Sequence, residues 1–366
     1  MLLVGDKSPS FTLIYLLIIV ALFGGCASVS APQGGDIDDI PPKLIETTPK
    51  ILTDIKPTQK ITISFNEYLE ETSLKNAIKI FPNGEYDFRY EYKGDEIDLW
   101  LPSNIEKDIT YMIVFNTNLK DEHGVRLKKD IIVPFSRESI FNSNTIKGNI
   151  FGDFSSVFIL LWFNHLDKNT MLNQVPDYIL NASSDTSYEF NFLPEKDFSI
   201  LAVEQYGSNI NYKEKPFSFY RKNKLSLKNG SLNNINFYLH KGKKEEPHDS
   251  EEKNDTDENK NVKTATLSGK VSGNFIHPIN LMLKNKKNNY SNTIQIDGNY
   301  VINEILEGKY QLLIYEDRNN NSVLDIGSFD SNEFAERFFV YPDSLILRAN
   351  WELEIPQWNY SNEEGK

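Results

Sequence analysis

The chain of 366 residues contains a single cysteine, Cys26, so no disulfide can form within it. Each folded unit must therefore be held by its own apolar core. Long stretches with a helical period are scarce while tyrosine and phenylalanine are abundant, and this balance favours β structure. Basic residues are also few, because 39 Lys and Arg stand against 52 Asp and Glu, for a net charge of -13. Without a basic stripe, the sequence predicts no nucleic-acid partner.

The longest apolar run near the N-terminus, Phe11 to Phe23, is shorter than the roughly 20 residues of a transmembrane helix. It follows Lys7 and ends at small residues, the three-part pattern of a secretory signal peptide. The segment FGGC at residues 23–26 resembles a bacterial lipobox. The resemblance implies removal of residues 1–25 and lipidation of Cys26, which would anchor the protein in a membrane. An ordinary signal peptide with an incidental cysteine is the alternative.

Residues 26–40 are small, contain Gly and Pro, and are expected to form a flexible tether. Surface-exported lipoproteins of the Bacteroidota carry acidic residues directly after the lipidated cysteine, whereas here they begin only at Asp36. An aspartate retention signal after Cys26 is absent too. By this resemblance we expect an outer-membrane lipoprotein that faces the periplasm, with the cell surface as the alternative.

Short alternating strands at spacings of about ten residues predict a β-sandwich over residues 41–137. The expected strands are 60–65, 78–81, 86–92, 97–101, 111–115 and 131–135. The opening prolines Pro41, Pro42 and Pro49, the strand ITISFNE at 61–67 and the turn KDEHG at 120–124 resemble the SbsA-type bacterial Ig-like domain. The resemblance covers about 95 residues.

An internal repeat organises the remainder, because IKGNIFG at 146–152 returns as LSGKVSG at 267–273. A strand–turn–strand segment at 188–202 likewise returns at 300–314. We expect two sandwiches, at 143–240 and 265–358, which resemble transthyretin-like or carboxypeptidase-regulatory domains; that family implies non-catalytic binding or spacer modules. Residues 241–264 contain almost no apolar side chains and are predicted to be a disordered charged linker. Residues 359–366 are expected to form a C-terminal tail.

The stretch from Glu316 to Asp330 carries the chain's one pattern of metal ligands. Positions 1, 3, 5 and 9 of a calcium loop are filled by Asp317, Asn319, Asn321 and Asp325. Two positions depart from the pattern: Ser322 replaces the glycine at position 6, and Ser328 replaces the bidentate glutamate at position 12. A carboxylate from Asp330, Glu333 or Glu336 could supply the missing ligand. The alternatives are a structural calcium site and an Asn-rich hairpin loop; no other cofactor is expected.

Other polar groups give weaker signals. Glu67 with Glu70 and Glu71, and the run Asp121 to His123, are expected to cap turns, with Gly124 at positive φ. The five histidines have no ligand spacing, so zinc is not predicted. No nucleophile elbow, zinc-binding helix or phosphate loop is present in the sequence.

The sequence therefore predicts an all-β protein with three consecutive antiparallel β-sandwich domains, Ig-like and prealbumin-like, after a lipoprotein signal peptide. It is expected to be no enzyme but a lipid-anchored spacer or protein-interaction module of the cell envelope. A carbohydrate- or peptidoglycan-binding lipoprotein is the alternative, and a hydrolase that uses paired acids such as Glu333 and Glu336 comes last. The four tryptophans, which sit in or beside apolar runs, are expected to pack in cores; their exposure would favour sugar binding.

Overall fold

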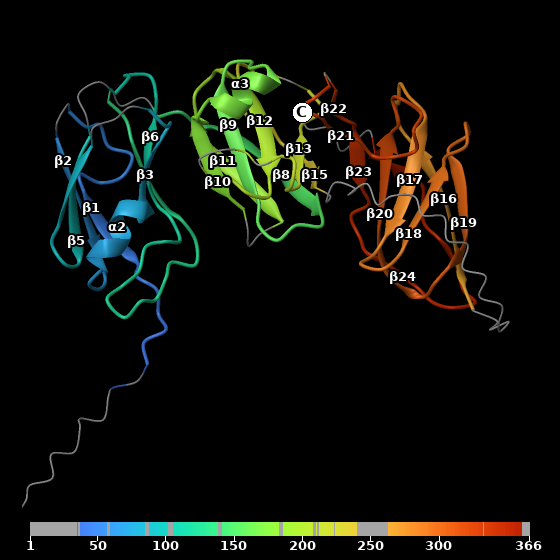
Figure 1. Ribbon diagram of the computed structural model, residues 1–366, viewed down its shortest axis with the longest axis horizontal. Coiled ribbons are helices and arrows are strands. Elements are labelled where there is room, and N and C mark those ends of the chain that lie inside the picture. Colours follow the sequence, from blue (N-terminus) through green and yellow to red (C-terminus); the bar gives the residue numbers. More distant parts are fainter. Residues whose placement is uncertain are drawn as a thin grey trace, which may run out of the picture. The chain divides into compact units, whose positions relative to one another are not determined.

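The computed structural model describes residues 35, 37–56, 59–84, 88–101, 105–137, 141–182, 186–207, 210, 212–222, 224–239, 263–331 and 333–360. The chain divides into two units, one that ends at Ile40 and one that begins at Pro41. The fold described below is that of the second unit. Strands dominate it from end to end (Figure 1). Among the described residues, no helix combines the length and the apolar character that a membrane crossing requires.

The first pair of sheets lies between residues 44 and 135 and encloses one apolar core. One sheet has the order β1–β2–β5–β4, with bounds Leu44–Thr48, Lys60–Phe65, Glu96–Trp100 and Arg89–Tyr92. The other has the order β3–β6–β7, with bounds Ile78–Phe81, Tyr111–Phe115 and Ile131–Phe135. All neighbours are antiparallel. Ile61, Ile63 and Phe65 alternate with less buried residues along β2 and face the core, as the period of two predicts.

A seven-residue helix, α2 (Glu71–Ala77), joins the two sheets and was not expected from the sequence. Its Leu74 and Ala77 are buried in the same core. Seven residues are too few to show a helical period in the sequence, so the hydrophobic pattern did not predict this helix.

The second pair of sheets lies between residues 144 and 239. One sheet has the order β11–β8–β15, with bounds Ser187–Leu193, Asn144–Gly152 and Phe237–Leu239. The other has the order β10–β9–β12–β13, with bounds Tyr178–Asn181, Phe158–Phe163, Asp197–Val203 and Phe217–Phe219, and β14 (Leu225–Ser226) also pairs with β12. A short helix, α3 (Lys168–Asn173), follows β9, and Asp167 caps its N-terminus by accepting a hydrogen bond from the Thr170 backbone N–H.

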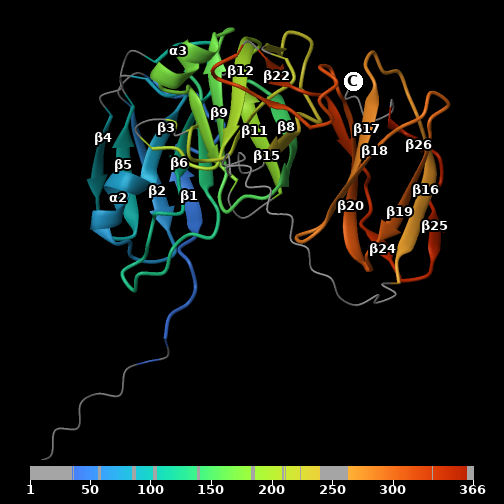
Figure 2. The ribbon, with the colours of Figure 1, turned by 45° about the vertical axis from the view of Figure 1, so that its right-hand side comes forward.

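The third pair of sheets, between residues 265 and 359, repeats this strand order. Figure 2 shows its strands in orange and red. One sheet has the order β19–β16–β25, with bounds Asn299–Ile305, Ala265–Ser272 and Glu352–Glu354, and β26 (Trp358–Asn359) also pairs with β16. The other has the order β18–β17–β20–β23, with bounds Asn289–Thr293, Ile279–Lys284, Gly308–Glu316 and Phe338–Val340, and β24 (Leu345–Leu347) also pairs with β20. A small hairpin, β21 (Ile326–Gly327) with β22 (Phe334–Ala335), is added between β20 and β23.

The two repeats match in local detail as well as in strand order. Tyr188 lies opposite Gly148 in the first, and Tyr300 lies opposite Gly269 in the second. A Cβ atom at Gly148 would lie 2.0 Å from the Ile235 carbonyl oxygen, so the close approach of that chain requires glycine. In the second repeat the Tyr300 ring lies against Gly269, and both tyrosines are buried. The repeat that the sequence predicts is thus present in the structure.

One feature of the repeats differs from the expected antiparallel sandwiches. The closing strand of each repeat runs parallel to its first strand: β15 to β8, and both β25 and β26 to β16. All other pairings in the named strands of these two units are antiparallel. The alternation of a strand records which face is buried but not the direction in which the strand pairs, so this difference was invisible in the sequence.

Candidate functional site

The four predicted metal-binding residues lie together in the loop that follows β20. Asp317 is only 2% exposed, and its carboxylate accepts hydrogen bonds from the Asn321 N–H at 3.1 Å and the Ser322 N–H at 2.8 Å. Asp325 Oδ2 accepts hydrogen bonds from the side-chain amides of Asn319, at 2.8 Å, and Asn321, at 3.2 Å. The loop therefore folds back on itself, and the side chains at positions 1, 3, 5 and 9 converge.

The departure at position 6 does not prevent the turn. Ser322 adopts φ of 58°, the left-handed conformation for which calcium loops use glycine. Asn320, two residues earlier, has φ of 57°. The backbone thus makes the sharp reversal without glycine, at the steric cost that a side chain carries in this region.

Of the three carboxylates that the sequence left open, Glu336 is the one that contacts the loop. Its Oε1 accepts a 2.7 Å hydrogen bond from the Arg318 N–H, and its Oε2 accepts one of 3.2 Å from the Asp325 N–H. The hairpin β21–β22 returns the chain to this point, where the Glu336 N–H donates to the Asp325 carbonyl oxygen. Asp330 and Glu333 are exposed near the tip of that hairpin, so neither of them occupies this position.

The loop concentrates negative charge without a cationic partner. None of Asp317, Asp325 and Glu336 forms a salt bridge with any Lys, Arg or His that the structure describes. Burial raises the pKa of Glu336 to about 7; the charges of Asp325 and Asp317 add to the rise, and the two backbone hydrogen bonds oppose it. Carboxylates in such a setting are normally paired or bound to a metal ion.

Two buried polar side chains support the loop from the adjoining sheet. Asn280, on β17, donates a 2.7 Å hydrogen bond to Asp317 Oδ2 and accepts one of 2.8 Å from the Thr293 hydroxyl. The Tyr315 side chain, on β20, is 1% exposed and lies opposite Asn280 in the pairing of β17 with β20. Burial raises the pKa of Tyr315 to about 12, with the charges of Asp317 and the other two carboxylates adding to the rise.

The corresponding loop of the first repeat has a different role. Glu204 occupies the position of Glu316, and both side chains are buried. Glu204 accepts hydrogen bonds from the backbone N–H and the hydroxyl of Ser155, whereas Glu316 accepts one from Arg337 at 2.8 Å. Gln205 stands where Asp317 stands in the second repeat, so the shared fold does not require a carboxylate there.

A buried lysine of the first repeat holds the tip of the β21–β22 hairpin. Lys168, 7% exposed, donates hydrogen bonds to the carbonyl oxygens of Ser328 at 2.5 Å, of Ser331 at 2.9 Å and of Glu333. Its ammonium group also lies 4.5 Å from the ring centroid of Phe219 and 4.6 Å from that of Phe334. Burial lowers the pKa of Lys168, while the Glu333 charge acts in the opposite direction. No sequence pattern singled out this lysine.

Aromatic rings complete this contact between the two repeats. Phe329, from the hairpin, is 8% exposed and belongs to the apolar cluster of the first repeat. Its ring centroid lies 4.5 Å from that of Tyr212, 5.1 Å from that of Phe217 and 4.8 Å from that of Phe219. We call Lys168, Phe329 and their partners the hairpin contact.

An open pocket of about 920 Å³ lies beside the hairpin contact and is lined by both repeats. Its first-repeat side includes Tyr220, Arg221 and Asn234, and its second-repeat side includes Gln311 and Tyr341. Amide, guanidinium and aromatic groups therefore share one concave surface. The sequence analysis did not identify this pocket, because its residues come from loops far apart in the chain.

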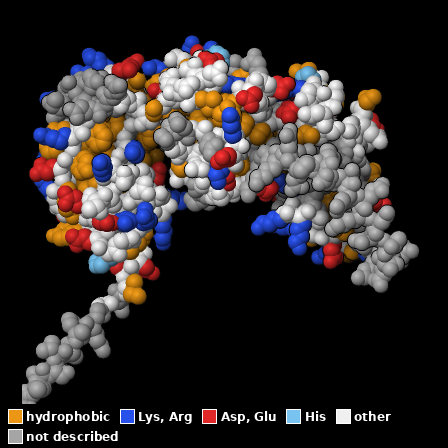
Figure 3. Space-filling view, in the orientation of Figure 1, with side chains coloured by type: hydrophobic (Ala, Val, Ile, Leu, Met, Phe, Trp, Pro, Cys, Tyr) orange, Lys and Arg blue, Asp and Glu red, His pale blue; other side chains and the backbone are white. Residues whose placement is uncertain are grey.

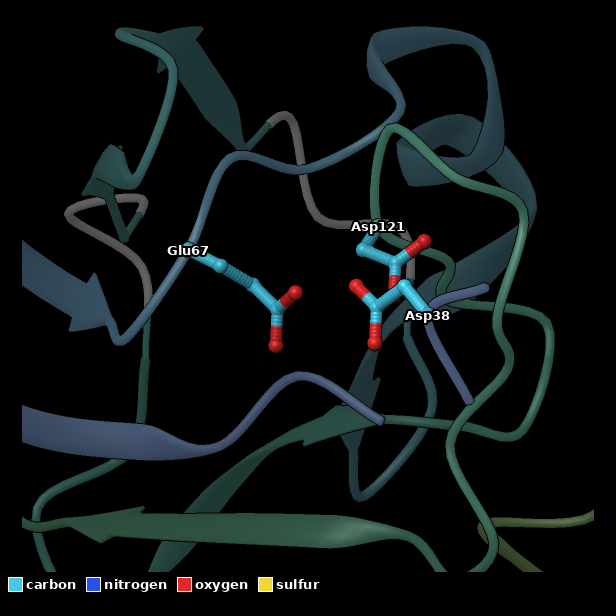
Figure 4. A group of neighbouring side chains, drawn as sticks. All are labelled: Asp38, Glu67 and Asp121. Atoms are coloured by element: carbon cyan, nitrogen blue, oxygen red, sulfur yellow. The ribbon is translucent and has the colours of Figure 1, made fainter. Parts of the chain in front are cut away.

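The remaining predicted residues lie elsewhere. Cys26 falls outside the described residues. Glu67 and Asp121 point toward the same space from the loop after β2 and the turn after β6, with carboxylate oxygens within 4.8 Å (Figure 4). Asp121 is buried, and its Oδ1 accepts a 2.9 Å hydrogen bond from the Val125 N–H. Gly124 has φ of 85°, as the turn predicted.

The tryptophans divide between core and surface. Trp162 and Trp358 are 0% and 6% exposed, as expected of core residues. Trp100 is half-buried under the Arg89 guanidinium, whose carbon lies 4.3 Å from the ring centroid. Trp351 is 61% exposed, so the expectation that it packs in a core was wrong. Its neighbours in the sequence are Asn350 and Glu352, and the apolar run Leu345–Leu347 ends before them.

Residues 38–136 match the family model of a bacterial Ig-like domain. This match covers the first pair of sheets and agrees with the Ig-like domain that the sequence predicts. No curated protein matches the chain.

Solved structures share only a distant likeness with the chain. The Bacillus anthracis TIE protein is 11% identical, with 89% of this chain and 59% of that chain covered and a TM-score of 0.17. For the N-terminal part of the bacterial S-layer protein SbsC the identity is 13%, the coverage 47% and 42%, and the TM-score 0.21. GBS52, the minor pilin of Streptococcus agalactiae, is 10% identical, with 59% of this chain and 96% of that chain covered and a TM-score of 0.18. The chain thus spans about three fifths of the first and two fifths of the second, and TM-scores this low carry no functional argument.

Proposed function

We propose that the protein is a non-enzymatic, lipid-anchored module of the bacterial cell envelope that serves as a spacer and presents a surface to envelope partners. The Ig-like domain at 38–136 and the all-β architecture fit such a role. The lipobox-like segment at 23–26 supports anchoring through Cys26 in the outer membrane, with the protein facing the periplasm. On the face drawn in Figure 3, basic side chains are scattered among acidic ones, which does not favour a nucleic-acid partner.

The hairpin contact is the observation that carries the spacer role. A buried ammonium group with three carbonyl acceptors and an aromatic cluster join two consecutive repeats. Inter-domain contacts with a polar, loosely packed interface leave domains free to move, whereas buried and well-packed contacts hold them. A spacer benefits from the second arrangement, since held units keep a constant separation between anchor and partner.

The spacer role predicts one fixed distance between the repeats in solution. With Cys26→Ser the chain has no cysteine, so Glu189→Cys and Glu352→Cys can be introduced on exposed sites of β11 and β25 and spin-labelled. Pulsed electron paramagnetic resonance should give a single narrow distribution of distances between the two spin labels. Lys168→Met should broaden it. A broad distribution in the parent protein would contradict the spacer role.

The anchor is tested separately by Cys26→Ser and membrane fractionation. Each buried acyl methylene contributes about 0.8 kcal/mol to membrane binding, so loss of the lipid should release the protein. Mutant protein that stays in the carbonate-washed membrane at the level of the unmutated chain would contradict lipid anchoring.

A second candidate function, glycan binding, is favoured by the open pocket. Sugars are commonly bound by aromatic faces together with amide and guanidinium groups, and Tyr341, Asn234 and Arg221 offer all three. Co-sedimentation with purified peptidoglycan would test it, with Tyr341→Ala and Asn234→Ala as pocket variants and Trp351→Ala as a variant outside the pocket. Loss of sedimentation in the pocket variants alone would support this function, and no sedimentation of the parent protein would exclude peptidoglycan as the ligand.

A further inference from the structure

Two carboxylates of the Ig-like unit point toward the same space, Glu67 from the segment after β2 and Asp121 from the turn after β6 (Figure 4). Their oxygens lie within 4.8 Å of one another. The backbone sets this approach, because Leu69 pairs with Asp121 in an antiparallel bridge and the Glu122 N–H donates a 3.1 Å hydrogen bond to the Tyr68 carbonyl oxygen. The fold itself therefore brings the two carboxylates together.

One oxygen of Asp121 is buried and has no hydrogen-bond partner among the described residues. The side chain is 1% exposed; its Oδ1 accepts the hydrogen bond from the Val125 N–H, whereas its Oδ2 accepts none from the part of the chain that the structure describes. Glu67 is partly buried, and its Oε1 accepts a 2.9 Å hydrogen bond from the Asn66 side-chain amide.

The pair also lacks a cationic partner. Neither Glu67 nor Asp121 forms a salt bridge with any Lys, Arg or His that the structure describes. A buried carboxylate oxygen without a donor or a cation costs free energy, and a second carboxylate nearby adds repulsion. A cation between the two groups would remove both costs.

We propose that Glu67 and Asp121 bind a calcium ion, which joins the segment after β2 to the turn after β6. Calcium takes oxygen ligands at about 2.3 to 2.6 Å, so two oxygens on one ion lie at most about 5 Å apart. The 4.8 Å bound on the Glu67 and Asp121 oxygens lies within that limit. Two carboxylates balance the charge of the ion. Because Glu67 is only partly buried, water can reach the ion and complete its shell of six to eight ligands.

Binding is tested by hydrogen exchange and mass spectrometry at pH 7, on the mature chain carrying Cys26→Ser, with and without 10 mM calcium chloride. We expect a dissociation constant of about 1 mM, the weak end of the range for extracellular modules. At ten times that concentration, calcium should slow exchange about tenfold in residues 66–70 and 119–125, because opening of these segments releases the ion. Magnesium at 10 mM should slow it less than twofold, since its shorter bonds of about 2.0 to 2.1 Å need oxygens closer together.

Variants locate the ion. Asp121→Asn and Glu67→Gln should each reduce the effect of calcium to less than twofold. Both substitutions keep the size of the side chain, and the amide oxygen at position 121 can still accept the hydrogen bond from Val125, so the turn is retained. Glu122→Gln, exposed and next to Asp121, is the matched control and should keep the tenfold effect. Asp317→Asn, in the loop after β20, should keep it too.

Three results would overturn the site. Exchange that is the same with and without calcium in the parent protein would exclude it. Slowing confined to residues 316–336, or equal slowing in the parent protein and in Asp121→Asn, would place the ion elsewhere. Slowing on a change from pH 7 to pH 5, with none on addition of calcium, would show that the two carboxylates share a proton instead.

Discussion

The ammonium group of Lys168 donates a 2.5 Å hydrogen bond to the carbonyl oxygen of Ser328, 160 residues further along the chain. The two residues belong to different repeats, and two further carbonyl groups share the same ammonium group. A buried cation of this kind replaces the water that all three carbonyl oxygens would otherwise bind. Its removal takes this donor from the carbonyl oxygens of Ser328 and Ser331, while the Glu333 oxygen keeps the hydrogen bond from the Ser328 N–H.

Lys168→Met should therefore destabilise the hairpin contact by about 2 kcal/mol, since an unsatisfied buried acceptor costs roughly 1 to 3 kcal/mol and partial hydration recovers some of that. Hydrogen exchange followed by mass spectrometry should show faster exchange in residues 326–336. Lys215→Met, on an exposed loop, is the matched control and should change nothing there. Unchanged exchange in Lys168→Met would mean that the aromatic rings alone hold the contact.

Phe329→Ala should weaken the same contact by about 3 kcal/mol, because a ring buried among three aromatic side chains is lost and a cavity is left. Phe219→Ala removes one of those partners. The loss of stability in the double variant should be smaller than the sum of the losses in the two single variants. The difference, the coupling energy, should be at least about 0.5 kcal/mol, as for residues in contact. Protection of residues 326–336 from hydrogen exchange measures the loss of stability in each variant. If the loss in the double variant equals the sum of the two single losses, the two rings do not pack directly against each other.

The Ig-like unit should show acid sensitivity that depends on Asp98. This carboxylate is 1% exposed; burial acts to raise its pKa, but hydrogen bonds from Lys93, Thr62 and Lys60 outweigh that effect and lower it to about 2. A lowered pKa stabilises the folded state above pH 4, and this contribution disappears as the pH falls from about 4 to about 2.

Asp98→Asn should accordingly lose about 1 to 2 kcal/mol at pH 7, a range reduced from the full shift because both lysines are partly exposed to solvent. The difference from the parent protein should narrow between pH 4 and pH 2. Urea unfolding at several pH values measures this. A difference that is constant with pH would assign the loss to packing instead of charge.

Each repeat has a β-bulge at the same place, in β11 of the first repeat and in β19 of the second. A substitution to glycine at the two bulges should have opposite effects on stability. Phe192 and Glu304 occupy equivalent positions, and each has φ of 58°. Glu304 is exposed, so Glu304→Gly should relieve backbone strain and stabilise the protein by up to about 1 kcal/mol. Phe192 packs against the core of its repeat, and the burial lost in Phe192→Gly should exceed the same relief. Thermal melts of both variants check the signs; destabilisation by Glu304→Gly would show that the bulge is not strained.

The sequence predicted the strands best where one face is buried and the pattern alternates. The expected strands 60–65, 78–81, 111–115 and 131–135 agree with the structure at both ends, since each has a clear inward face. The repeat was also visible, because a shared fold keeps apolar and glycine positions in register. The exposed ring of Trp351 was misassigned, since burial there depends on a loop and not on a strand period.

The candidate site was only partly predictable. Asp317, Asn319, Asn321 and Asp325 lie within nine residues, so their spacing alone brings them together. Glu336 lies eleven residues beyond Asp325, and its return depends on the β21–β22 hairpin, which has two residues in each strand and no readable pattern. Lys168 was invisible for the same reason: its acceptors are backbone groups of another repeat, and backbone groups leave no trace in a sequence.

The parallel closing strand determines where the chain enters and leaves each repeat. In the first repeat the chain enters at Asn144, and the parallel pairing places Leu239 beside Gly152, at the far end of β8. At about 3.3 Å per residue, entry and exit are roughly 25 Å apart. An antiparallel closing strand would have returned the chain to its starting edge. Each repeat therefore advances the chain by a strand's length, and adding or deleting a repeat would change the reach of the protein by a fixed step.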